Sequence, residues 1–180
     1  DPNQVTDTLA RLGLTAANVN SPTQVVAAGT LEQLAALAAD PPPRARIVPL
    51  QVAGAFHTHH MAPAVEVLAD LTAAVTPGAP TATVLSNADG AAVASGAEVL
   101  TRLVSQVSNP VRWDRCMATM AELGVTALIE LPPAGTLVGL AKRSLPGVEL
   151  LALRSPDDLE AARDLVARHA GRAARSGVGA

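Results

Sequence analysis

The spacing of apolar residues changes at Gly54, and this change limits the possible folds more than any other feature of the chain. Before Gly54 the pattern predicts a helix that has begun before Val5 and a hairpin of strands 16–20 and 24–28. A helix over 31–39 and a strand over 46–52 are predicted to follow. This order is an α+β unit that matches the split βαββαβ motif without its opening strand.

After Gly54, helices and buried strands alternate. The pattern predicts helices over 61–75, 97–107, 111–123, 136–145 and 157–168, the last with Ser155 as its N-cap, and strands over 83–87, 126–131 and 148–153. Alternation of this kind is typical of α/β proteins, in which helices cover a parallel sheet. We therefore expect an α/β fold, with residues 171–180 as a frayed tail.

Composition narrows the possible partners. The 180 residues are 49% hydrophobic and 16% charged with a net charge of −3, which is typical of a compact protein. Phe56 and Trp113 are the only aromatic residues and there is no basic stripe, so no nucleic-acid partner is expected. Apolar runs are far shorter than the roughly 18 residues that span a bilayer, and no leader segment is expected. We therefore expect a soluble, cytoplasmic protein without a membrane partner.

Three of the four histidines, His57, His59 and His60, lie between a predicted strand end and a predicted helix start. A zinc site is one interpretation, but the spacings are neither HExxH nor those of a zinc finger, and Cys116 is the single thiol. Exposed histidines at a helix start are a second interpretation. The third is one catalytic histidine, and this role favours His57 because an apolar strand end leads into it, whereas His59 and His60 are expected to face water.

A catalytic base needs a nucleophile to activate, and the sequence shows none. No serine lies in a GxSxG elbow. Cys116 is spaced from Trp113 and Met117 like a residue on one face of a helix, which favours a small core or helix-face residue over a nucleophile. The chain therefore offers a candidate base without its partner.

Two further segments have open interpretations. Asn18, Asn20 and Gln24 lie at the ends of the hairpin strands, where amides serve either turn chemistry or the orientation of an amide-containing ligand. The loop at 132–135 follows a buried strand, so it is either a ligand-facing loop or a plain connection, and it has no phosphate-loop spacing.

Five motifs in order carry a family resemblance. They are Ala17-Asn18-Val19-Asn20-Ser21-Pro22-Thr23-Gln24, Gly54-Ala55-Phe56-His57-Thr58-His59-His60-Met61, Ser86-Asn87, Gln106 with Asn109-Pro110-Val111-Arg112-Trp113, and Glu130-Leu131-Pro132-Pro133-Ala134-Gly135-Thr136-Leu137 with Lys142-Arg143. Together they resemble the C-terminal part of malonyl-CoA:acyl carrier protein transacylases of the actinobacterial type, over nearly all of residues 1–170.

The resemblance implies an α/β-hydrolase-like acyltransferase domain with an inserted ferredoxin-like small subdomain. Residues 1–52 would be most of that subdomain, without its first strand, 53–170 the C-terminal part of the large domain, and 171–180 a flexible tail. In this family a serine in a GHSxGE elbow carries malonyl as an ester from coenzyme A to the phosphopantetheine thiol of acyl carrier protein. That serine, a GQG segment and an arginine that pairs with the malonyl carboxylate are expected upstream of Asp1.

The resemblance also assigns roles to residues that are present. His57 matches the catalytic histidine, and Gln106 matches the position whose backbone carbonyl orients it. Asn18 and Asn20 match a motif that borders the substrate cleft. Phe56, in the GAFH form, matches the position that accompanies malonyl rather than methylmalonyl, the alternative being that it merely fills the core.

The implied partners are malonyl-CoA, acyl carrier protein and the missing N-terminal part of the same enzyme, with no bound cofactor and no metal. The alternative function is a non-catalytic, acyltransferase-like module that docks acyl carrier protein. A serine elbow encoded upstream would distinguish the two functions.

Overall fold

The computed structural model describes residues 2–170 and divides by its internal contacts into two compact units. The first unit extends to Ala118 and the second begins at Thr119. Three two-stranded sheets lie within the described residues, two of them antiparallel and one parallel. The protein is thus a mixed α/β chain, and each unit is described separately.

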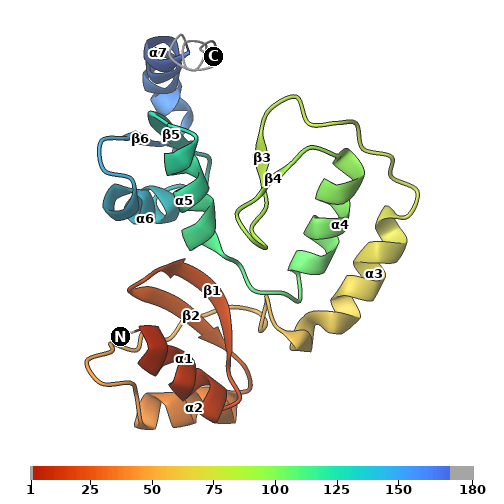
Figure 1. Ribbon diagram of the computed structural model, residues 1–180, viewed down its shortest axis with the longest axis vertical. Coiled ribbons are helices and arrows are strands. Elements are labelled where there is room, and N and C mark those ends of the chain that lie inside the picture. The colour runs from red at the N-terminus through yellow and green to blue at the C-terminus, as the bar shows by residue number, and fades with distance from the viewer. Residues whose placement is uncertain (1, 171–180) are drawn as a thin grey trace. The chain divides into compact units, whose positions relative to one another are not determined.

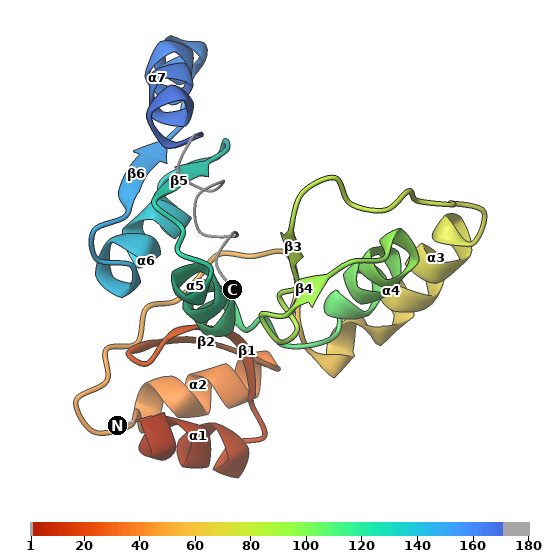
Figure 2. The ribbon, with the colours of Figure 1, turned by 45° about the horizontal axis from the view of Figure 1, so that its top comes forward.

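The first unit opens with two helices that cover one face of a hairpin (Figure 1). Helix α1 (Pro2–Arg11) leads into strands β1 (Thr15–Ser21) and β2 (Gln24–Ala28), which are antiparallel, and helix α2 (Leu31–Ala39) follows. Figure 2 shows both helices on the same side of the hairpin. Leu9, Leu14 and Leu37 form the buried core between these elements. The predicted helix, hairpin and helix are therefore confirmed.

The ends of α2 follow directly from the local sequence. The Thr30 side chain accepts a hydrogen bond from the Gln33 amide, and the Gln33 side chain accepts one from the Thr30 amide, which makes a capping box. Asp40 ends the helix, and three prolines follow, which cannot continue it.

The prediction of a strand over 46–52 is wrong. This segment has no regular secondary structure, and Val48, Leu50 and Val52 are exposed. Alternating apolar residues make a strand only where a neighbouring strand accepts its backbone hydrogen bonds, and no strand within residues 2–170 pairs with this segment.

The rest of the first unit contains two helices and a short hairpin. Helix α3 (Ala62–Thr72) packs against α4 (Gly96–Gln106), while strands β3 (Val84–Leu85) and β4 (Ala92–Val93) pair antiparallel. Strand β3 lies within the predicted strand 83–87, but the sequence pattern did not predict β4 or the antiparallel pairing. Gly90, at a φ of 77°, permits the tight reversal, and its amide donates to the Ser86 carbonyl.

A second difference concerns the segment after α4. The sequence predicted that helix 111–123 would include Val111, yet Val111 lies beside β1. Its amide donates to the Ala17 carbonyl and its carbonyl accepts from the Val19 amide, both at 2.8 Å. The bond from Val19 uses the Val111 carbonyl, which a helix starting at Val111 would need, and helix α5 (Trp113–Glu122) begins two residues later.

The second unit contains the parallel strands that the alternating pattern predicted. Strand β5 (Ala127–Glu130), helix α6 (Thr136–Ser144) and strand β6 (Glu149–Ala152) are followed by a short 3-10 helix (Pro156–Asp158), capped by Ser155, and by helix α7 (Leu159–His169). The His169 ring joins α7 to both strand segments, with Thr126 Oγ1 at 2.8 Å and Glu149 Oε2 at 2.9 Å. None of the described helices is long and apolar enough to cross a membrane. The predicted tail at 171–180 lies outside the described residues.

Candidate active site

His57 occupies a tight turn between the loop after Gly54 and helix α3. Its φ of 65° lies in the left-handed region, which costs a residue with a Cβ about 1–3 kcal/mol. The His57 amide donates to the Val107 carbonyl at 2.9 Å, just after the last turn of α4. This bond ties the strained turn to the end of α4.

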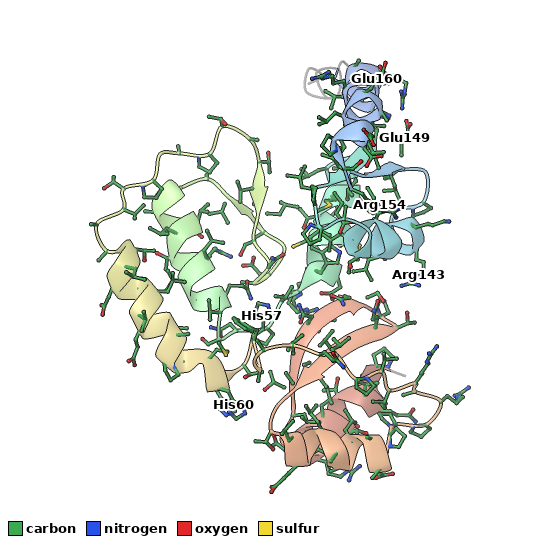
Figure 3. All side chains as sticks on the ribbon, turned by 180° about the vertical axis from the view of Figure 1, so that it is seen from behind. His57, His60, Arg143, Glu149, Arg154 and Glu160 are labelled. Atoms are coloured by element: carbon green, nitrogen blue, oxygen red, sulfur yellow. The ribbon has the colours of Figure 1, made fainter. Side chains whose placement is uncertain are left out.

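The imidazole of His57 is oriented by the same helix end. Its Nδ1 lies 2.8 Å from the backbone carbonyl oxygen of Gln106. A carbonyl can only accept, so Nδ1 carries the proton, and in the neutral ring Nε2 is left as the acceptor. Figure 3 shows His57 in this turn, which lies between the α3 and α4 segments.

Gln106 is itself held in place by its side chain. Its Nε2 donates to the carbonyls of Asn109 at 2.7 Å and Pro110 at 3.0 Å. These two bonds fix the chain reversal that follows α4, and with it the direction of the Gln106 carbonyl. The sequence assigned only the main chain of Gln106, whereas the structure shows that its side chain also shapes the site.

His59 and His60 belong to a separate, exposed feature. Both side chains face solvent, and their rings lie 4.1 Å apart in a short 3-10 helix (His59–Met61). Figure 3 shows His60 at the outer side of this segment, away from His57. Within residues 2–170 no three His, Cys, Asp or Glu side chains converge as metal ligands.

Phe56 is 47% exposed, so its ring is not part of the core that residues 2–170 form. Its ring stands edge-on to the imidazole of His57, with 6.4 Å between the ring centroids. An exposed aromatic ring beside an oriented imidazole can form one wall of a small apolar site.

The hairpin amides lie on strands β1 and β2. Asn18 pairs with Val26 on β2 and forms a bridge to Val111, and both Asn18 and Asn20 are half-buried on β1. Among residues 2–170 neither side chain forms a hydrogen bond with His57. Gln24 is exposed at the start of β2. The bridge links β1 to the segment that follows Gln106.

Cys116 is a core residue, as its spacing predicted. It is 1% exposed, and its Sγ donates to the Ser86 carbonyl at 3.4 Å. Burial, followed by the negative charges of Asp114 and Asp89, raises the pKa of the thiol. A thiol that resists ionisation in this way is a poor nucleophile.

Glu130 is a buried carboxylate that opens the fifth motif and to which the sequence assigned no role. It ends β5, is 6% exposed, and accepts hydrogen bonds from the amides of Gly135, Leu137 and Val138 at 2.8–2.9 Å. Burial raises the pKa of Glu130, but the amides of Val138, Leu137 and Gly135 outweigh burial and hold it below its usual value. The carboxylate thus caps α6 and also binds the Gly135 amide at the end of the loop at 132–135, which supports the interpretation of that loop as a connection.

The fold is similar to those of solved structures. The crystal structure of MCAT from Mycobacterium tuberculosis matches with a TM-score of 0.86 and 52% identity, over 89% of this chain and 53% of that chain. The mixed α/β fold is therefore that of a known class of acyl-group transferases.

Sequence comparison identifies particular relatives of this chain. Malonyl CoA-acyl carrier protein transacylase of Mycobacterium tuberculosis is 52% identical over 160 residues, which are 89% of this chain and 53% of that protein. The protein of the same name from Mycolicibacterium smegmatis is 49% identical over 164 residues, covering 89% of this chain and 57% of that protein. No family model matches the chain. The chain is homologous to malonyl CoA-acyl carrier protein transacylases, which confirms the resemblance seen in the sequence, and it spans about half the length of these curated relatives.

Proposed function

We propose that this chain supplies the histidine-bearing, C-terminal part of an enzyme that transfers malonyl from malonyl-CoA to acyl carrier protein. The single observation that carries the proposal is the hydrogen bond from His57 Nδ1 to the Gln106 carbonyl, which leaves Nε2 as the acceptor. The homology to malonyl CoA-acyl carrier protein transacylases supports the choice of reaction.

In the proposed mechanism His57 serves both half-reactions. Its Nε2 takes the proton of a serine that another part of the enzyme supplies, and the serine oxygen attacks the malonyl thioester carbonyl. Nε2 then returns the proton to the departing thiolate of coenzyme A, leaving a malonyl-serine ester. In the second half-reaction Nε2 deprotonates the phosphopantetheine thiol, which attacks the ester, and the serine regains a proton. The Gln106 carbonyl stabilises the imidazolium formed in each half-reaction, as the acidic residue does in a hydrolase triad.

The finer architecture belongs to the same proposal. Residues 1–52 form most of a ferredoxin-like small subdomain, and 53–170 form part of an α/β-hydrolase-like large domain. The helix, hairpin and helix around Leu9 and Leu37 support the first assignment. The parallel pair β5 and β6 with its helices supports the second. Asn18 and Asn20 would border the substrate cleft, and Phe56 would contact the malonyl group.

The proposal predicts that the 180-residue chain alone does not transfer malonyl, because it has no serine elbow to form the ester. The experiment is to measure transfer of radiolabelled malonyl to acyl carrier protein by this chain and by the serine-bearing full-length enzyme, with a serine-to-alanine variant as the control.

We expect activity only from the full-length enzyme with its serine. Transfer by the 180-residue chain alone would contradict the mechanism. A full-length protein that binds acyl carrier protein but transfers nothing would favour the docking module instead.

A further inference from the structure

Thr58, the residue after His57, is the most deeply buried polar side chain near the candidate site. It is 1% exposed, although a hydroxyl is costly to bury without partners. No feature of the proposed reaction uses this hydroxyl. Its hydrogen bonds therefore need a separate explanation.

The hydroxyl bridges the two arms of the turn that carries His57. Thr58 Oγ1 donates to the carbonyl of Ala55 at 2.6 Å and accepts from the amide of His60 at 3.2 Å. Ala55 precedes His57 and His60 follows it. One side chain thus joins the backbone on both sides of the histidine.

The turn needs such a constraint because His57 has a φ of 65°, a conformation that the surroundings must impose on a residue with a Cβ. The bonds to Val107 and Gln106 hold His57 from the side of α4. They do not connect the two arms of the turn to each other. Thr58 makes that connection, and its burial prevents water from replacing the hydroxyl.

We propose that Thr58 is a positioning residue that holds His57 in the left-handed turn and so keeps Nδ1 on the Gln106 carbonyl. The consequence for catalysis rests on the proposed function, but the consequence for the imidazole does not. Without the hydroxyl the turn relaxes, the bond to Gln106 is lost, and the ring adopts the Nε2-protonated tautomer that free histidine prefers in water.

The first test is spectroscopic and needs no turnover. The full-length enzyme is labelled with 15N-histidine, and the His57 ring signals are assigned by their loss in H57Q. We expect Nδ1 to be protonated in the parent protein and in Thr58→Ser, and a shift toward Nε2 protonation in Thr58→Val. Thr72→Val is the matched control, because its hydroxyl also donates to a backbone carbonyl, that of Leu68 at 2.8 Å, within α3.

The second test is kinetic. Thr58→Val should lower kcat roughly 10- to 100-fold, with KM for malonyl-CoA changed less than about twofold, because a displaced base slows the chemical step. Should Thr58→Val fail to fold, the pair Thr58→Ala and Thr58→Ser replaces it, since both lose the methyl group and only one loses the hydroxyl.

The outcomes separate the two proposals. A folded Thr58→Val protein with Nδ1 still protonated, or with unchanged kcat, would overturn the role of Thr58. Equal losses in Thr58→Ala and Thr58→Ser would overturn it as well, because the methyl group would then be the cause. If the parent enzyme transfers no malonyl but the tautomer responds as expected, the proposed function fails while the positioning role stands.

Discussion

His57 in the first unit and Glu130 in the second are both polar side chains bound by backbone groups next to a helix end. They differ in how many of their polar atoms these backbone groups bind. One nitrogen of His57 is bound by the Gln106 carbonyl, and Nε2 has no hydrogen bond within residues 2–170. Both oxygens of Glu130 are occupied by amides of the α6 N-terminus, and the side chain is buried.

The difference separates a candidate catalytic group from a structural one. An oriented group with a free acceptor atom can exchange a proton with a substrate, whereas a buried group with both oxygens bound by backbone amides contributes its free energy to folding. Substitutions at the two positions should therefore affect different measurements: activity at His57 and stability at Glu130.

The largest expected effect is at His57. In the full-length enzyme His57→Ala should lower kcat/KM for malonyl transfer roughly 10²- to 10⁴-fold, because it removes a positioned general base. His59→Ala and His60→Ala are matched controls in the same segment and should change the rate far less, since their rings face solvent. Steady-state kinetics on the three variants measure this. Equal losses at all three positions would contradict the assignment and revive the metal interpretation.

The next effect concerns substrate choice at Phe56. If the Phe56 ring lines the site of the malonyl α-carbon, the extra methyl group of methylmalonyl must overlap the ring. This overlap should favour malonyl-CoA over methylmalonyl-CoA by about 10- to 200-fold in kcat/KM. Phe56→Ser should therefore narrow the ratio of kcat/KM for malonyl-CoA over methylmalonyl-CoA. The measurement compares both substrates with the parent and variant enzymes. An unchanged ratio in a folded variant would remove Phe56 from the specificity site.

The smallest effect on activity, and a clear one on stability, is expected at Glu130. Glu130→Gln keeps the shape but replaces one carboxylate oxygen with an NH2 group that cannot accept, so at least one amide of α6 loses its partner, at a cost of about 1–3 kcal/mol in the free energy of unfolding at pH 7. Urea denaturation of the full-length enzyme measures this cost. Glu122→Gln, an exposed control on α5, should stay within about 0.5 kcal/mol.

The pH dependence at Glu130 has a definite sign. Its pKa is lowered in the folded protein, so the stabilisation is present above the ordinary glutamate value and is lost as the pH falls through the folded value. The difference between parent and Glu130→Gln should therefore shrink in acid. A difference that is constant from pH 7 to below about 4 would show that the charge of Glu130 does not stabilise the capped helix.

Local patterns in the sequence predicted much of the secondary structure, because the interactions behind them are local. The helix predicted over 31–39 is observed as α2, which begins after the Thr30 cap and ends at Asp40, before three prolines. The prediction of a strand over 46–52 is wrong because strand formation is not local. The segment has the alternating apolar residues of a strand, but a strand also needs a neighbouring strand, which the local sequence does not specify.

The sequence by itself determined the α/β class, the hairpin, most helix positions and the choice of His57 as the residue to examine. Only the tertiary structure decided that Nδ1 faces the Gln106 carbonyl, 49 residues away, that Thr58 connects the arms of the turn, and that Glu130 caps α6. These features depend on which backbone groups are left unpaired once helices and strands have formed. That is settled by packing between distant segments and not by the identity of neighbouring residues.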